Sequence, residues 1–333
     1  RRTASADGTQ ARNMAAPRPA PPPPRRSGRR TGRRIAGTLL VLLLAALAWP
    51  IGLALWTNEH LAHVDALVSG GTDAGRTYLV AGSDKRGSGG VTDLTEGQRA
   101  DSILIVHVAP NNQAYLISIP RDTYVELPAQ GGQKITSAYA YGGAQLLVQA
   151  VQDLTGMHID RYVEVGFGSL TELVDAVGGV ELCMDATVDD HDSKLVWEAG
   201  CHEADGKLAL AFSRMRKSDP LGDLGRAARQ RQVVSQLMKK TLTPSLVYRP
   251  DRQLELAKAG TAALTVDQDA NIIDLGRLLL DFKAATGPEG IQGMPTVANI
   301  DYRPGGIGSA VLLDPDKAPA EFAAIQAGTW TGN

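Results

Sequence analysis

The chain has 333 residues, of which 43% are hydrophobic, and it carries 34 Lys and Arg against 36 Asp and Glu, for a formal net charge of −2. That apolar content is enough to build a full buried core. Ten Arg and a single acid, Asp7, fall within residues 1–34, so the remainder is acidic and a nucleic-acid partner is not indicated for it.

Residues 35–56 read IAGTLLVLLLAALAWPIGLALW, 22 residues without a charge. A membrane-spanning helix needs about 20 such residues. Because the Arg-rich residues 1–34 precede this segment, the positive-inside rule places the N-terminus in the cytoplasm and the rest outside. A cleaved signal peptide is the alternative, but its apolar region is usually about 7–15 residues long. We predict a disordered Pro/Arg-rich tail (1–34), one transmembrane helix (35–56) in the cell membrane, a connector (57–76) and an extracytoplasmic domain (77–328).

The chain has two cysteines, Cys183 and Cys201, and both fall in the exported part. An oxidising compartment permits a disulfide between them. Two buried free thiols are the alternative. With so few cysteines, a cysteine-based metal site is not expected.

The exported part alternates strand-like and helix-like segments. Strands are indicated where short β-rich apolar runs are bounded by turn residues, and helices where apolar residues recur every three or four positions. In chain order these are strands at 77–81, 102–108 and 114–119, a helix at 144–156, a strand at 162–165, a helix at 169–177, a strand at 180–184, and helices at 207–212, 226–240 and 271–286, with a loop at 222–225. This order predicts an α/β fold, an α-β-α sandwich with a central mixed sheet covered by helices on both faces.

Polar residues cluster where the first three predicted strands end or begin. Asp84 follows the first strand, Arg99 and Asp101 open the second, and Arg121 and Asp122 follow the third. If consecutive strands pair antiparallel, all three positions share one rim of the sheet. Two interpretations are open at this point: a solvated rim of salt bridges, or a site at which two carboxylates and two Arg converge.

Residues 213–232, SRMRKSDPLGDLGRAARQRQ, add a second group. In the predicted helix, one stripe is formed by Arg226, Gln230, Val233 and Leu237. Two polar residues therefore begin a stripe that is otherwise directed to the core. Burying an unpaired Arg is costly, so the site needs an anionic partner. Arg229 and Arg231 are expected to be ordinary surface charges.

Several Arg with two or three carboxylates suit a pyrophosphate together with a divalent cation. Arg neutralises phosphate oxygens in a bidentate manner, and carboxylates hold Mg²⁺. Arg214 and Arg216 lie two residues apart and share a face if the backbone is extended. No His-Cys cluster indicates zinc, and neither a GxSxG elbow nor a P-loop sequence is present.

From about residue 77 to residue 240 the chain resembles the LytR-CpsA-Psr family. The resemblance is carried, in the family's order, by TYLVAGSDKR, RADSILIVHV, LISIPRDTYVELP, KITSAYAYGG, FGSLTELVDAVGGVEL and SRMRKSDPLGDLGRAARQRQ. It implies an enzyme, a phosphotransferase that moves a glycopolymer such as teichoic acid or arabinogalactan from a polyprenyl-pyrophosphate carrier to peptidoglycan and forms a phosphodiester. Known members use Mg²⁺ (or Mn²⁺) and hold the lipid tail in an apolar pocket.

The resemblance also assigns roles to residues of this chain. It makes Asp84 and Asp101 the metal-side aspartates, and it implies a catalytic role for both together with Arg121 and Arg216. The residues that match its pyrophosphate-binding positions are Arg99, Arg121, Arg214, Arg216, Asp223, Arg226 and Gln230. The family often has Asn where this chain has Thr136, which leaves a polar role at that position undecided.

Two other functions use the same residues. A lipid pyrophosphatase would use water as the acceptor in place of peptidoglycan. A membrane-tethered binding or regulatory protein would hold the lipid-linked polymer without turnover. In the transferase reaction a hydroxyl of the wall glycan attacks the glycan-side phosphorus and polyprenyl phosphate leaves, so the protein acts mainly by positioning and electrostatics.

Overall fold

The computed structural model describes residues 28–69, 71, 73–83, 100–166, 169–215, 218–219, 223–241 and 248–332. The chain divides into two compact units, one up to Ile51 and one from Gly52 onward. Residues 1–27, most of the expected cytoplasmic tail, lie outside the described residues.

Helix α1 (Gly28–His60) contains the uncharged segment 35–56. It is the one helix in the described ranges that is long and apolar enough to cross a membrane, over Gly37–His60. Pro50 lies inside it, which a bilayer helix tolerates. The helix extends beyond both ends of the apolar segment, because helical backbone need not stop where charge begins. This helix fits a membrane anchor.

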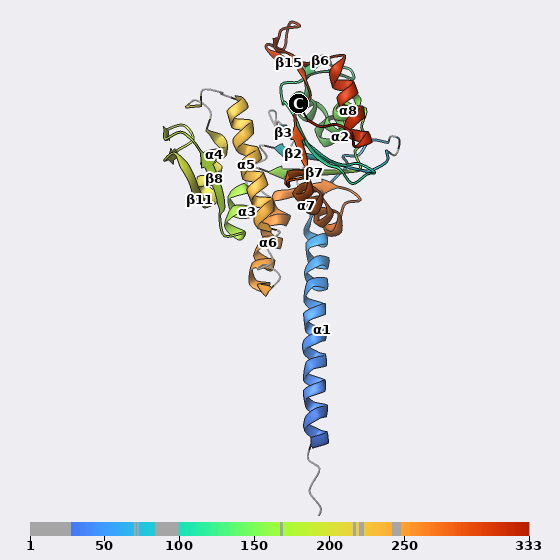
Figure 1. Ribbon diagram of the computed structural model, residues 1–333, viewed down its shortest axis with the longest axis vertical. Helices are drawn as coiled ribbons and strands as arrows, with labels where there is room; N and C mark the ends of the chain where they lie inside the picture. Colours follow the sequence, from blue (N-terminus) through green and yellow to red (C-terminus); the bar gives the residue numbers. More distant parts are fainter. Residues whose placement is uncertain are drawn as a thin grey trace, which may run out of the picture. The chain divides into compact units, whose positions relative to one another are not determined.

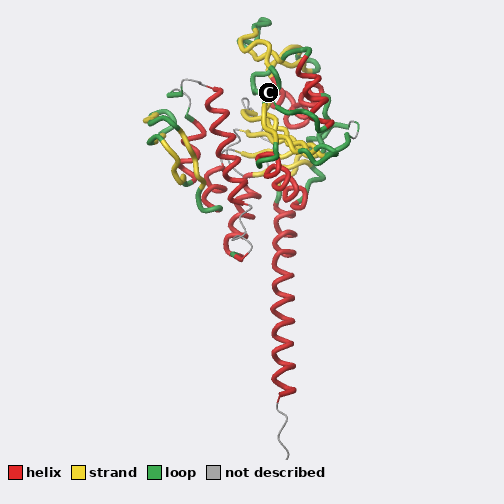
Figure 2. Tube along the Cα trace, in the orientation of Figure 1, coloured by secondary structure: helices red, strands yellow, loops and turns green. Residues whose placement is uncertain are grey.

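The second unit is built on a mixed sheet (Figures 1 and 2). Its seven described strands lie in the order β1-β12-β7-β2-β3-β4-β13. The pairs β2–β3, β3–β4 and β7–β12 are antiparallel, and the pairs β1–β12, β2–β7 and β4–β13 are parallel. The strands are β1 (Ala62–Val64), β2 (Arg76–Ser83), β3 (Ala100–Val108), β4 (Ala114–Ile119), β7 (Arg161–Gly166), β12 (Leu264–Asp267) and β13 (Ile291–Gly293).

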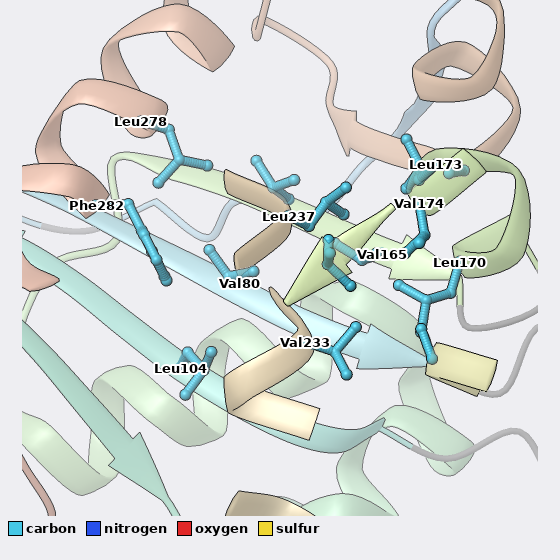
Figure 3. Close-up of a cluster of buried hydrophobic side chains, with 14 of the residues drawn as sticks. Val80, Leu104, Val165, Leu170, Leu173, Val174, Val233, Leu237, Leu278 and Phe282 are labelled. Carbon is cyan, nitrogen blue, oxygen red and sulfur yellow. The ribbon is translucent and has the colours of Figure 1, made fainter. Parts of the chain in front are cut away.

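Helices cover both faces of this sheet. Successive strand residues point to opposite faces, so Tyr78 and Val80 of β2 enter one core cluster while Leu79 and Ala81 enter the other. The Val80 face packs against α3 (Leu170–Ala176), α4 (Gly206–Arg214), α5 (Asp223–Thr241), α6 (Pro250–Ala263) and α7 (Ile272–Thr286), and the other face packs against α2 (Ile135–Thr155) and α8 (Lys317–Ala327). Figure 3 shows Val80 among the side chains of the first cluster. The predicted α-β-α sandwich is confirmed.

The other described strands form two-stranded sheets. They are β5 (Tyr124–Leu127) with β6 (Gly131–Lys134), β8 (Val180–Met184) with β11 (Gly200–Ala204), β9 (Val188–Asp190) with β10 (Leu195–Trp197), and β14 (Val297–Tyr302) with β15 (Ala310–Leu313). Cys183 and Cys201 lie directly opposite each other on β8 and β11, with Cα atoms 4.0 Å apart, and form a disulfide. The expected bridge is confirmed, and closing an 18-residue separation is worth about 3 kcal/mol in the chain-entropy picture.

The predicted strands correspond to β2, β3, β4, β7 and β8, and the predicted helices correspond to α2, α3, α4, α5 and α7. The helix expected at 144–156 is the second part of α2, which the backbone interrupts at Gly142 and Gly143. Gly143 has φ 63°, a conformation that glycine adopts without strain. The loop expected at 222–225 is wrong from residue 223 onward, since α5 begins at Asp223. Strand β1 lies within the segment expected as a connector.

Candidate active site

Strand β2 ends, β3 begins and β4 ends at the same rim of the sheet, as antiparallel pairing of consecutive strands predicts. Ser83, the last residue of β2, pairs with Ala100, the first residue of β3. Strand β4 pairs antiparallel with β3 and ends two residues before Arg121. Asp84 follows Ser83 in the chain and Arg99 precedes Ala100, and both lie outside the described residues. The backbone therefore brings Ser83 and Ala100, the described neighbours of these two residues, to the same rim as Arg121.

A β-bulge lies at this rim. Gly82 pairs with Ser102 and Ser83 pairs with Ala100, so Asp101 is the extra residue on β3 between the two pairs. Bulges bend a strand and change the direction of its side chains, and they are frequent beside active sites. Asp101, which the family resemblance assigns as a metal-side aspartate, therefore lies where the hydrogen-bonded ladder between β2 and β3 is interrupted.

Arg121 is half-buried, with 22% of its side chain exposed. Its Nε lies 3.5 Å from Oδ2 of Asp122, and Oδ1 of Asp122 lies 3.0 Å from Nζ of Lys134. One carboxylate therefore faces two cations at the rim. Such a group of charges favours an incoming anion over a cation.

Thr136 ties the start of α2 to this rim. Its backbone N–H donates to the carbonyl of Arg121 at 3.1 Å, and its hydroxyl Oγ1 donates to the carbonyl of Ala100 at 2.9 Å. The side chain is buried, with 7% of the residue exposed. The polar role left undecided at Thr136 is therefore positional: one residue fixes the backbone next to Asp101 and the backbone of Arg121.

A buried carboxylate that the sequence did not predict lies just inside the rim. Glu164 on β7 is 2% exposed. It accepts hydrogen bonds from the hydroxyls of Ser83 at 2.6 Å, Tyr139 at 2.8 and 2.9 Å, and Tyr162 at 3.1 Å. Burial, and next the neighbouring Glu164, raise the pKa of both Tyr139 and Tyr162 above the ordinary phenol value, so both remain donors at working pH. Glu164 joins the ends of β2 and β7 to α2.

Replacing Tyr139 by Phe should lower the free energy of unfolding by about 1–3 kcal/mol, because it removes a donor from a buried carboxylate. Chemical denaturation of the purified protein measures this loss. Tyr141→Phe is the matched control, since Tyr141 lies on the same helix and is 55% exposed. Equal stability of the two variants would mean that the Glu164 contacts do not hold the rim.

Helix α5 carries the polar start of the stripe predicted from the sequence. Val233 and Leu237 are buried in the cluster that contains Val80, and α5 packs against β3 (Figure 3). Arg226 is half-buried and Gln230 is 6% exposed. Within the described part of the chain, Oε1 of Gln230 accepts no hydrogen bond. A buried polar atom without a partner is costly, and a bound ligand that supplied the partner would remove that cost.

The expectation that Arg229 is a surface charge is wrong. Arg229 is 8% exposed, and its guanidinium forms an ion pair with Asp219. It also donates to the carbonyl of Phe212 at 3.0 Å and to the carbonyl of Met215. Arg229 therefore fixes the chain that follows α4 against the first turns of α5, and its role is structural.

Among the described side chains, no group of three or more His, Cys, Asp or Glu could hold a metal ion. Asp84 and the side chain of Asp101 fall outside that set. In the chain, these two residues directly follow Ser83 and Ala100, which pair with each other at this rim. Carboxylates are the ligands that a hard, oxygen-preferring cation such as Mg²⁺ takes.

Comparison with known proteins identifies the family of this chain. The LytR_cpsA_psr family matches residues 57–291. The chain belongs to the LytR-CpsA-Psr family. A relative, the probable cell wall biosynthesis protein LcpB of Corynebacterium glutamicum, is 34% identical over 303 residues, which cover 87% of this chain and 71% of LcpB. Another is TagU of Enterococcus faecalis, a polyisoprenyl-teichoic acid–peptidoglycan teichoic acid transferase, 35% identical over 215 residues, which cover 63% of this chain and 67% of TagU.

Solved structures of the LytR-CpsA-Psr family share the fold. TagT bound to LIIa-WTA aligns with a TM-score of 0.61 at 25% identity, over 80% of this chain and 99% of that one. TagV of B. subtilis aligns with a TM-score of 0.62 at 24% identity, over 78% of this chain and 100% of that one, which shows the fold alone.

The family positions fall into three groups in this structure. Arg121, Arg226 and Gln230 are described with their side chains and are at least half-buried. Arg214, the last residue of α4, is exposed, so the structure does not bring it into the buried part of the site. The remaining positions are placed by backbone alone or lie outside the described residues: Asp101 and Asp223, and Asp84, Arg99 and Arg216.

Proposed function

We propose that this protein transfers a glycopolymer from a polyprenyl-pyrophosphate carrier to peptidoglycan and forms a phosphodiester. The observation that carries the proposal is the single rim where β2 ends, β3 begins and Arg121 is held by Thr136. Support comes from the named activity of TagU and from the structure of TagT with LIIa-WTA.

The residues of the rim suit this chemistry. A hydroxyl of the wall glycan attacks the glycan-side phosphorus, the bridging P–O bond breaks, the hydroxyl proton passes to a base, and polyprenyl phosphate leaves. Arg121 and Arg226 would bind the phosphate oxygens, because a guanidinium matches them in a bidentate manner. The unpartnered carbonyl oxygen of Gln230 would accept a hydrogen bond from the donor's head group.

We also propose that Asp84 and Asp101 hold Mg²⁺ (or Mn²⁺) at this rim. When bound, the cation neutralises charge on the phosphates. What supports this is the pairing of Ser83 with Ala100 at the rim, since each of these residues is followed in the chain by one of the two aspartates.

The chain from Thr57 onward would lie outside the cytoplasm. The Arg-rich residues 1–34 come before the apolar helix, which favours a cytoplasmic N-terminus. The bond between Cys183 and Cys201 supports the same side, since disulfides persist in oxidising compartments. The glycan donor and the peptidoglycan acceptor would then be reached at the outer surface of the membrane.

To test this, the full chain in detergent is incubated with several lipid-linked glycans and with peptidoglycan oligomers. Each mixture contains Mg²⁺, Mn²⁺ or a chelator. The expected result is a peptidoglycan-linked product and free polyprenyl phosphate, both lost with chelator. Mass spectrometry identifies the product and its phosphodiester.

Two outcomes would overturn the proposal. Release of polyprenyl phosphate without any linked product would identify a lipid pyrophosphatase. Binding of the donor with no turnover under any metal condition would identify a tethered binding or regulatory protein.

A further inference from the structure

Helix α7 carries large apolar residues on two opposite faces. Leu278 and Phe282 are buried against the sheet, as Figure 3 shows. Ile273 and Leu280 are 63% and 59% exposed. These two residues lie seven positions apart, and positions seven apart share a face of a helix. The outer face of a helix in a soluble domain is normally polar, so this face needs an explanation.

The same outer face is cationic. Arg277 and Lys283 are both exposed. The helix's two acids offset these cations only in part. Asp281 is 9% exposed and accepts two hydrogen bonds from Arg76. Asp274 lies 3.7 Å from Arg277 but also 3.5 Å from Arg161, so one carboxylate faces two Arg and Lys283 stays outside this group. An outer face of Ile, Leu, Arg and Lys has the composition of a helix that lies in a membrane interface.

The start of α7 is held at the point where the chain leaves the apolar segment. The backbone N–H of Ile272 donates to Oδ1 of Asn58 at 3.3 Å. Asn58 lies two residues after Trp56, the last residue of the uncharged segment, and within the same compact unit as α7. At about 1.5 Å per helical residue, that is about 3 Å along α1. Trp is enriched at membrane–water interfaces, so the first turn of α7 belongs at headgroup level.

We propose that the outer face of α7, defined by Ile273, Arg277, Leu280 and Lys283, rests on the lipid surface of the membrane that holds the anchor. Two apolar side chains bind a bilayer weakly by themselves. The covalent connection through α1 makes the contact intramolecular, which raises its effective concentration. Arg277 and Lys283 add attraction to anionic headgroups.

This contact would set the height of the active-site rim. Helix α7 packs on β3 and β4, so the sheet would lie one helix layer above the lipid. A helix with its side chains is about 10–12 Å thick. The inference is independent of the proposed transfer reaction, but such a height would suit a substrate whose lipid tail stays in the membrane.

The experiment uses the full chain reconstituted in phosphatidylcholine vesicles with and without phosphatidylglycerol, each made with and without nitroxide-labelled lipid. Single cysteines are introduced as Ile273→Cys, Leu280→Cys and Ile300→Cys, and each is labelled with an environment-sensitive fluorophore. Cys183 and Cys201 are joined and do not compete for the label. Ile300 is 75% exposed on β14 and serves as the matched control.

The emission maximum of labels at positions 273 and 280 should shift to the blue, and the nitroxide-labelled lipid should quench their fluorescence. The label at position 300 should show neither effect. Lys283→Glu in the Leu280→Cys background should reduce this nitroxide quenching on vesicles that contain phosphatidylglycerol. Water-exposed emission at both α7 positions would overturn the proposal. An equal blue shift in detergent at high protein concentration would also overturn it, because a second copy of the chain would then cover this face.

Discussion

Replacing Arg226 by Ala should lower the rate of glycopolymer transfer by about 100- to 1,000-fold, the usual cost of removing one charge-stabilising donor. Arg226 opens the α5 stripe, one turn before Gln230 and two turns before Val233, and it is half-buried. A ligand bound here could donate the hydrogen bond that Oε1 of Gln230 lacks among the described residues. The free energy of unfolding should change little, because functional charge in a site is normally a burden to stability.

Initial rates with a lipid-linked donor, measured beside melting temperatures, separate these two effects. Arg121→Ala should behave in the same way, since Arg121 reaches the rim from a different segment. Lys239→Ala is the control: Lys239 is an exposed cation in the last turn of the same helix. Near-wild-type transfer by both Arg variants would defeat the proposed site, even though the family membership would stand.

The sequence was sufficient to predict the rim because the rule that places it is local. Short apolar runs separated by turns pair antiparallel, and the ends of such strands alternate between two rims. The end of β2 and the start of β3, where Ser83 and Ala100 pair, therefore follow from the order of the strands in the chain. The bulge at Asp101 could not be expected, since a one-residue shift in register leaves no mark in composition.

Glu164 shows what the sequence could not reveal. Its four neighbours in the chain, Tyr162, Val163, Val165 and Gly166, read as an ordinary strand. Two of the hydroxyls that satisfy its carboxylate come from β2 and α2, which are distant in sequence. A carboxylate on the same strand face as the buried Tyr162 was the available signal, because a buried charge implies partners. Their identity depends on tertiary packing.

Arg229 was misassigned for a related reason. It lies three residues after Arg226 and four before Val233, spacings that share a helix face. Helical spacing alone therefore did not separate it from the buried stripe. Its partners, Asp219 and the carbonyls of Phe212 and Met215, come from the segment before α5. Gly225 belongs to the same arrangement, because a Cβ atom there would overlap the carboxylate of Asp219.

Replacing Arg229 by Ala should lower the free energy of unfolding by about 3–5 kcal/mol, because it leaves a buried carboxylate without its cation. Two backbone carbonyls also lose their donor. Chemical denaturation measures the loss, and Arg226→Ala, one turn earlier on α5, is the matched comparison. Arg229→Lys should recover only part of the stability, since an ammonium keeps the charge but not the planar fork that reaches three acceptors.

The two positions should therefore differ in kind. Arg229→Ala should lose transfer in proportion to the fraction unfolded, and at a temperature where it is fully folded its rate should exceed that of Arg226→Ala. If Arg229→Ala instead keeps wild-type stability and loses transfer, then Arg229 belongs to the group that contacts substrate. Its burial against Asp219 would in that case hold the guanidinium in place for the phosphates, and a purely structural role for Arg229 would be wrong.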